Sequence, residues 1–140
     1  MRDVAGELYA DLIGKPFLWR GRGEGGFDCF GLVLEMFKRA GQDMPEWDTP
    51  AEIAAVSGLV SVEFSQSRWV RCERRPGAMV LFNMPLRIEN RRVLATTHCG
   101  FMVTAQDFLH SWEKTGGITT ERLYEWERRV EGFYEFRGQE

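Results

Sequence analysis

The sequence predicts an α+β domain in which N-terminal helices pack on an antiparallel β-sheet. Apolar residues recur at helical spacing in the first third of the chain, most clearly over residues 29–40. From residue 78 onwards, short runs rich in β-branched and aromatic residues alternate with turn signals, as the strands of a meander do. Because helices come first and strands follow, the two kinds of element are segregated along the chain, which is typical of this fold class. The 140 residues are expected to form one domain, residues 1–140.

The first helix is predicted over residues 4–13. Val4, Leu8 and Leu12 fall on one face at a spacing of four residues, and a glycine ends the segment. Residues 15–28, which follow, are rich in glycine. They are expected to form a loop whose backbone can approach a ligand closely.

The helix over residues 29–40 has the clearest local signals in the sequence. Asp28 stands where an N-cap carboxylate can accept hydrogen bonds from the first turn, and Gly41 supplies a left-handed stop. Cations occupy the last turn, where they complement the negative end of the helix dipole. The apolar face consists of Cys29, Val33, Met36, Phe37 and Ala40.

The rest of the chain is predicted to contain a short helix followed by strands. The short helix has Asp48 or Thr49 as its cap and Pro50 at its first position. The predicted strands cover residues 78–84, 97–104, 107–113, 119–126 and 130–136.

Cys29 lies in the first turn of the predicted helix, which is a position that suits a nucleophile. A helix N-terminus presents unpaired backbone N–H groups and the positive end of the macrodipole, and both favour a thiolate. The alternative is that Cys29 is a buried core residue, as many cysteines are. A base elsewhere in the chain is needed to decide between the two.

The chain has two histidines, His98 and His110, and both fall in the strand-rich half. A nucleophilic thiol needs a base, and a thiol–imidazole pair oriented by a third polar group is the recurrent arrangement. The two histidines therefore supply one candidate base and one candidate orienting group. Taken singly, either histidine could instead be a core or surface residue.

The direction in which the two histidines point depends on the hairpin between their strands. A two-residue turn at residues 105–106 would pair Phe101 with His110 and place His110 on the face opposite His98. For both to serve one site, the connection must have an odd number of residues or a strand must contain a bulge. We therefore predict an irregular hairpin, with both imidazoles on the face that covers the helix of Cys29.

Composition excludes several classes of function. The net charge of −3 argues against a general nucleic-acid binder. No apolar run is long enough to span a bilayer, so no membrane insertion is expected. The opening stretch MRDVAGELYADLIG has an amphipathic pattern and not a signal-peptide core, so synthesis in the cytoplasm without a signal peptide is expected.

Neither a cofactor nor a metal ion is expected. The three cysteines, Cys29, Cys72 and Cys99, form no C-x-x-C unit, which argues against a disulfide framework or a structural zinc site. His98 and Cys99 are adjacent in a predicted strand. Because adjacent strand residues point to opposite faces, these two would not converge on one metal.

Several segments resemble the NlpC/P60 cell-wall peptidases. The segment PFLWRGRGEGGFDCFGLV is similar to the cysteine motif of that family, which leads to Asp-Cys-Ser-Gly-Leu-Val. THCGFMV resembles the His-x-Gly strand of the family, and FLHSWEKTGGITTERL resembles the next strand, which carries a third polar residue. RRPGAMVLF is similar to the Pro-Gly-Asp strand, and VEGFYEFR to the Gly-Phe-Tyr-Arg ending common in phage-tail members. The resemblance spans residues 8–137.

The resemblance implies a papain-like α+β fold and assigns roles to individual residues. Cys29 matches the nucleophile, His98 the general base, and His110 the residue that orients the base. The residues expected to bind substrate, all in the cysteine motif, are Asp28, Phe17, Phe30 and Trp19.

Three positions depart from the family pattern. Phe17 stands where the family commonly has a tyrosine whose hydroxyl contributes near the oxyanion, so that donor is missing. Phe30 replaces the usual small serine after the nucleophile, which narrows or reshapes the substrate cleft. Ala78 replaces the acid of the Pro-Gly-Asp strand, which is a more peripheral change.

The function implied is that of a cysteine endopeptidase. Its substrate is the peptide stem of peptidoglycan, where the family typically cuts a bond involving D-glutamate and diaminopimelate. The phage-like ending and the lack of a signal peptide favour a component of a virion tail tip, with other tail-tip proteins as partners. Two alternatives stay open: a structural tail-tip protein with little activity, and a cysteine amidase or acyltransferase of the same fold.

Overall fold

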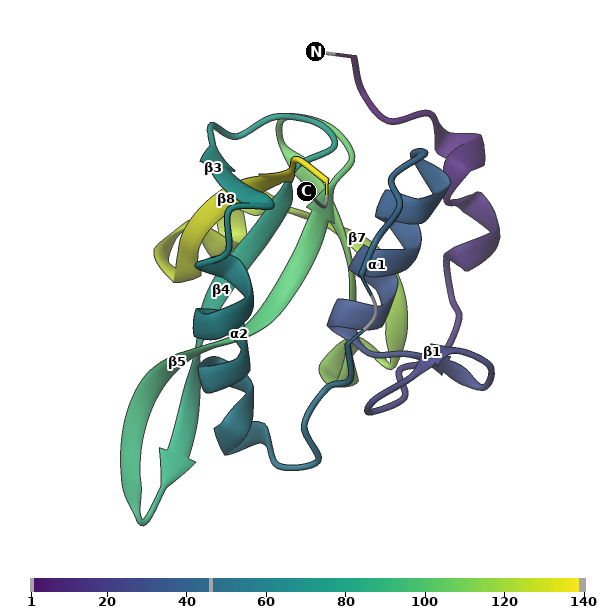
Figure 1. The fold of residues 1–140 in the computed structure, drawn as a ribbon. Coiled ribbons are helices and arrows are strands. Elements are labelled where there is room, and N and C mark those ends of the chain that lie inside the picture. The colour runs from purple at the N-terminus through teal and green to yellow at the C-terminus, as the bar shows by residue number, and fades with distance from the viewer. Residues whose placement is uncertain (1, 46, 139–140) are drawn as a thin grey trace.

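The computed structural model describes residues 2–45 and 47–138. Its centre is a six-stranded antiparallel sheet with the strand order β3-β8-β4-β5-β6-β7 (Figure 1). Its strands are β3 (Trp69–Cys72), β4 (Met79–Ile88), β5 (Arg91–Met102), β6 (Asp107–Trp112), β7 (Gly117–Arg122) and β8 (Val130–Phe136). A separate two-stranded ribbon consists of β1 (Arg22–Gly23) and β2 (Gly26–Phe27).

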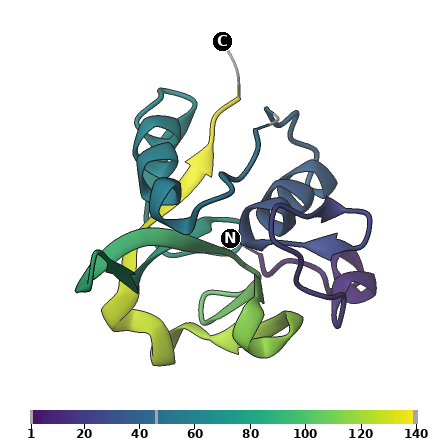
Figure 2. The same ribbon diagram turned by 90° about the horizontal axis from the view of Figure 1, so that it is seen from below.

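The α-helices α1 (Cys29–Arg39) and α2 (Val56–Phe64) lie on the same face of the sheet (Figures 1 and 2). Short 3₁₀ segments complete the structure: η1 (Gly6–Leu8), η2 (Ala10–Leu12), η3 (Ile53–Ala55), η4 (Glu113–Thr115) and η5 (Leu123–Arg129). The predicted α+β class, with helices packed on an antiparallel sheet, is confirmed.

Alternation along the strands gives the sheet two apolar faces. Cys99 and Phe101 belong to the larger core, which they form with the apolar sides of α1 and α2. Phe82 and Phe108 belong to a second core, where Trp126 of η5 covers them. Neighbouring residues of one strand therefore contribute to different cores.

Helix α1 forms as predicted because its local signals agree. The Asp28 carboxylate accepts a hydrogen bond from the Gly31 N–H at 2.7 Å, which caps the first turn. Lys38 and Arg39 occupy the last turn, and Gly41 follows with a φ of 96°, a left-handed conformation in which a Cβ is strained.

The predicted helix over residues 4–13 is wrong, because the segment forms the two 3₁₀ turns η1 and η2. Gly6 weakens an α-helix at its start. The connection between β5 and β6 also holds the segment, since the Val4 N–H donates to the Val103 carbonyl at 2.7 Å. An isolated helix this short is marginal in water, so contacts with the rest of the fold decide its form.

The predicted strand over residues 119–126 is correct only in its first part. β7 ends at Arg122, and η5 follows it. A strand would point Leu123 and Trp126 to opposite faces. A 3₁₀ segment has three residues per turn and buries both side chains against the same face of the sheet.

The helix predicted to begin at Pro50 begins later, with η3 and then with α2 at Val56. The Thr49 hydroxyl donates to Asp28 at 2.5 Å and accepts from Arg22 at 3.0 Å, so it does not cap a helix. β3 has no counterpart among the predicted strands and pairs with β8 at the edge of the sheet.

β4 and β5 continue well beyond their predicted ranges as a paired arm. The arm turns at Glu89 and Asn90, whose φ values of 50° and 65° fit a type I′ turn. Figure 1 shows this hairpin projecting from the body of the molecule. Charged residues such as Arg87 and Arg92 interrupt the apolar alternation there, so the sequence gives a weak strand signal.

Candidate active site

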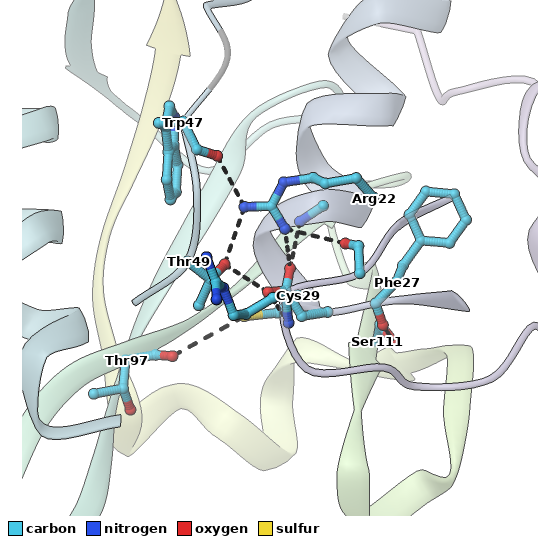
Figure 3. A network of polar contacts seen from close by, with 11 residues as sticks. Arg22, Phe27, Cys29, Trp47, Thr49, Thr97 and Ser111 are labelled. Atoms are coloured by element: carbon cyan, nitrogen blue, oxygen red, sulfur yellow. Dashed lines mark hydrogen bonds and ion pairs between the residues drawn. The ribbon is translucent and has the colours of Figure 1, made fainter. Parts of the chain in front are cut away.

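Cys29 is the first residue of α1, and its side chain points toward β5. The sulfur lies 4.0 Å from the carbonyl oxygen of Thr97 (Figure 3). The N–H groups in the first turn of a helix have no intrahelical acceptor. The backbone N–H of Cys29 can therefore donate to an oxyanion that forms beside the sulfur.

A bulge in β5 lies beside Cys29. On the neighbouring strand β4, Phe82 pairs with His98 and the next residue pairs with Thr96, which leaves Thr97 as an extra residue. Bulges bend a strand and re-aim the side chains next to them. The bulge directly precedes His98 and places a backbone carbonyl against the thiol.

The hairpin between β5 and β6 has the irregular form that the sequence predicts. Met102 lies opposite Phe108, so an odd number of residues, 103–107, connects the paired positions. His98 and His110 consequently share one face of the sheet. His98 Nε2 lies 2.8 Å from His110 Nδ1. The prediction that both imidazoles lie on one face is confirmed.

The face itself is opposite to the predicted one. His98 stacks on Phe82, and His110 packs with it on the side that η5 covers. The intervening Cys99 points to the side of α1. Because side chains alternate along β5, His98 cannot share the face of Cys99. Cys29 and His98 meet instead at a cavity that both of them line.

A carboxylate, Glu121, binds the second histidine of the pair. His110 Nε2 lies 2.5 Å from Glu121 Oε2, and the Trp126 indole N–H donates to Glu121 Oε1 at 3.2 Å. His110 lies opposite Thr119 in the pairing of β6 with β7, and Glu121 is two residues further along the same face. Glu121 is not among the site residues that the sequence predicts. Its only sequence signal is a carboxylate in the strand that follows His110.

Burial controls the charge of the two imidazoles. Burial lowers the pKa of His98 well below its usual range, and the neighbouring His110 lowers it further. Burial also lowers the pKa of His110, although the hydrogen bond and charge of Glu121 oppose that shift. Both rings are therefore neutral near pH 7, so His98 is in the form that can accept a proton.

The cavity shared by Cys29 and His98 has a volume of about 170 Å³. Phe17 and Trp19, which the sequence predicts to bind substrate, also line it. Its other walls are Ile53, Met84, Pro85, Thr97, Trp112, Glu113 and Lys114. The walls are mostly apolar and aromatic, and two charged side chains lie among them.

The structure does not bring Asp28 or Phe30 into this cavity. Asp28 is buried and accepts hydrogen bonds from Arg22 at 2.8 Å and from Thr49. Figure 3 shows Arg22 reaching toward Thr49 and Trp47. Phe30 packs edge-on against Trp47, with ring centroids 5.0 Å apart. Both residues hold the start of α1 in place.

The other two thiols lie in environments that disfavour a thiolate. Burial raises the pKa of Cys99 well above its usual range, and its hydrogen bond with Cys29 raises it further. Burial also raises the pKa of Cys72, which is half-buried in β3. Neither Cys72 nor Cys99 lines the cavity of His98.

Two negative findings apply to residues 2–45 and 47–138. None of the helices there has both the length and the apolar character needed to cross a membrane. No three or more histidine, cysteine, aspartate or glutamate side chains in this part of the chain gather to hold a metal ion.

Comparison with known proteins finds short matches to endopeptidases. Probable endopeptidases from Mycobacterium bovis and from two strains of Mycobacterium tuberculosis are 48% identical to it over 33 residues. The match covers 24% of this chain and 9% of each relative, so the chain spans only a small part of their length.

Solved structures show the same fold. A Staphylococcus aureus protein described as similar to a lipoprotein of the NLP/P60 family matches 95% of this chain and 40% of its own, at 16% identity and a TM-score of 0.65. A Bacillus cereus NlpC/P60 family protein matches 96% of this chain and 41% of its own, at 15% identity and a TM-score of 0.63.

A third structure matches along most of both chains. The NlpC/p60 domain of the peptidoglycan hydrolase SagA covers 92% of this chain and 92% of its own, at 15% identity and a TM-score of 0.55. The sequence model of the NlpC/P60 family matches residues 14–134, which include Cys29 and both histidines. The chain therefore belongs to the NlpC/P60 family.

Proposed function

We propose that this chain is a cysteine endopeptidase that hydrolyses an amide bond in the peptide stem of peptidoglycan. Cys29 is the nucleophile, His98 the general base, and His110 the residue that orients the base. The observation that carries the proposal is the cavity that Cys29, at the start of α1, shares with His98. The family and the peptidoglycan hydrolase among its structural neighbours support the substrate class.

The proposed reaction proceeds through an acyl-enzyme. The Cys29 sulfur bonds to the carbonyl carbon of the scissile amide while the thiol proton passes to His98 Nδ1, because His98 Nε2 faces His110. The backbone N–H of Cys29 donates to the oxyanion. The C–N bond then breaks as His98 returns the proton to the leaving amine.

Water completes the cycle. It attacks the thioester carbon while His98 accepts one of its protons, the C–S bond breaks, and the proton returns to the Cys29 sulfur. The products are a new carboxyl group and a new amine. We place Phe17 and Trp19 against the stem peptide, because both line the cavity of the nucleophile.

Digestion of purified peptidoglycan tests this proposal. We expect the wild type to release stem fragments that gain one water per cut, identified by mass, and Cys29→Ala to release none. Cys72→Ala is the matched control, because it removes a thiol outside the cavity. No cleavage by the wild type, together with an unreactive Cys29, would favour a structural role. Products of another amide cleavage or of acyl transfer would favour the amidase or acyltransferase alternative.

We also propose that the protein is a tail-tip component of a phage or prophage. The support is the closing segment over residues 130–137, which resembles the ending of phage-tail members of the family. Mass spectrometry of purified tail particles tests this location. Absence of the chain from particles that contain the other tail proteins would contradict it.

A further inference from the structure

We propose that Glu121 is a positioning residue that fixes the tautomer of both histidines, so that His98 presents an unprotonated Nδ1 to the cavity of Cys29. The inference deepens the proposed function. It rests on His98 acting as the base for Cys29, and it does not depend on the identity of the substrate.

The direction of the hydrogen bonds follows from the chemistry of the carboxylate. An ionised carboxylate only accepts hydrogen bonds, so Glu121 requires donors from both of its partners. The Trp126 indole N–H is always a donor and bonds to Oε1. His110 must therefore carry its proton on Nε2, where it faces Oε2 at 2.5 Å.

The tautomer of His110 then determines that of His98. A neutral imidazole with its proton on Nε2 has a lone pair on Nδ1. His110 Nδ1 faces His98 Nε2 at 2.8 Å, so His98 must donate from Nε2. The lone pair of His98 is left on Nδ1, which is the nitrogen not bound to His110. We call this chain of hydrogen bonds, from His98 through His110 to Glu121, the relay. Each hydrogen bond in it has one allowed direction, because the carboxylate at its end can only accept.

Removing the carboxylate removes that direction. Without Glu121, His110 can carry its proton on Nδ1 and donate to His98 Nε2, which moves the proton of His98 to Nδ1. In that tautomer His98 cannot accept the thiol proton. A wrong histidine tautomer is the reason for the large activity loss when the orienting carboxylate of a serine protease becomes an amide.

Few charged or titratable groups face the histidines among the described residues. Glu121 of β7 bonds to His110, and each imidazole faces the other. At the cavity, His98 shares the walls with Cys29, and with Glu113 and Lys114 near the start of η4. Glu121 is the carboxylate with a direct contact to an imidazole.

Glutamine at position 121 provides a sharp test because it has one acceptor oxygen and one NH₂ donor. The site needs two acceptors, one for Trp126 and one for His110. In Glu121→Gln, the amide oxygen can accept a hydrogen bond from one of the two N–H donors, and the amide NH₂ group then faces the other donor. Replacing Trp126 with Phe removes one of the two donors. The amide oxygen can then accept a hydrogen bond from His110 Nε2, which restores the direction of the relay.

The experiment combines histidine NMR with alkylation of Cys29. The chain has only two histidines, so their ring nitrogens can be assigned and the protonated nitrogen of each ring identified at a pH where both are neutral. We expect both wild-type rings to carry the proton on Nε2. In Glu121→Ala we expect His98 to populate the Nδ1–H form and Cys29 to react about 10- to 100-fold more slowly with iodoacetamide at neutral pH. A loss of this size is typical when a metal-ligating histidine loses the carboxylate that orients it.

Glu125→Gln is the matched control, because it removes an exposed carboxylate from η5 beside Trp126 and should change neither readout. The alkylation rate of Cys29 in Glu121→Gln should fall between the rates in the wild type and in Glu121→Ala. The same substitution should slow alkylation less in a Trp126→Phe background than in the wild-type one. If Glu121→Ala does not fold, the two glutamine variants decide the question.

Two results would overturn the inference. One is a wild-type His98 with its proton on Nδ1. The other is a set of Glu121 variants that keep the wild-type tautomers and alkylation rate. A wild type that shows the predicted relay and leaves peptidoglycan intact would reject the proposed substrate and keep the role of Glu121.

Discussion

Each of the three cysteines lies in a different chemical environment, although all three carry the same group. Cys29 combines the N-terminus of a helix with a cavity that also holds His98. Cys99 lies beside it but on the packed side of β5, where the pKa of its thiol is raised by burial. Of the three thiols, the one in the first turn of α1 is therefore the one that shares a cavity with an imidazole.

We predict that Cys29 is alkylated faster than Cys72 and Cys99 in the folded protein. Thiolates are the reactive form, and burial raises the pKa of both competitors. A time course with iodoacetamide, read by peptide mass, measures the order. Earlier modification of Cys72 or Cys99 under native conditions would count against Cys29 as the nucleophile.

We predict unequal roles for His98 and His110. Replacing His98 with Ala removes the base, and losses of about 10²- to 10⁴-fold in turnover are usual for such groups. Replacing His110 with Asn or Gln should leave measurable activity, because an amide can still accept a hydrogen bond from His98 Nε2. Peptidoglycan digestion rates compare the variants. An equal, complete loss in both would contradict this hierarchy.

At the scale of elements, the start of α1 depends on a buried polar cluster. Asp28 caps the helix through Gly31 and binds Arg22 and Thr49, all at hydrogen-bonding distance. The loop over residues 15–28 is held on its other side, where the Ser111 hydroxyl donates to the Phe27 carbonyl at 2.7 Å. The cluster places Cys29 without itself lining the cavity.

We predict that Asp28→Ala destabilises the fold by about 3 kcal/mol, because it removes a helix cap and leaves a partly buried Arg22 without its carboxylate. The midpoint of urea unfolding measures the change. Asp11→Asn is the control, since Asp11 also binds an arginine but is exposed, and its effect should be much smaller. Similar effects of both substitutions would mean that Asp28 contributes only a surface charge.

The elements that the sequence predicted correctly are those with local signals. α1 has its cap, its apolar face and its stop within the segment from Asp28 to Gly41, and it forms as expected. The segment over residues 4–13 has helical spacing as well, but it forms 3₁₀ turns and is bonded to the connection between β5 and β6. Local pattern alone could not predict that outcome.

The site was predictable only in part, because some of its contacts depend on residues distant in sequence. A cysteine at a helix start and only two histidines in the chain were enough to nominate three residues. Glu121 required the register of β6 with β7, which depends on the turn at η4 and on Gly116 with its φ of 77°. The placement of Phe30 in the core, beside Trp47, depends on a loop distant in sequence.

At the scale of the whole molecule, the sheet separates two environments. Its α-helical side holds the larger core with Cys99, and its other side holds the smaller core, in which aromatic rings surround the histidines. His110 has no exposed surface, and His98 is 5% exposed. The histidine pair is therefore part of the packing of the fold, so protonating an imidazole affects the stability of the fold.

We predict that stability falls as the pH decreases below about 6.5, the ordinary pKa of histidine. Burial lowers the pKa of both imidazoles in the folded state, so below this pH the unfolded chain binds protons that the folded chain does not, and unfolding is favoured. The slope is at most about 1.4 kcal/mol per pH unit for each histidine. The pKa of Asp11 is lowered by its hydrogen bond with Arg39, so that carboxylate titrates below this window.

Thermal unfolding midpoints between about pH 7.5 and about pH 5.5 measure the fall, and a His98→Asn, His110→Asn double variant should show a flatter profile. A wild-type midpoint that stays constant or rises over this range would mean that the folded histidines bind protons as readily as the unfolded ones do.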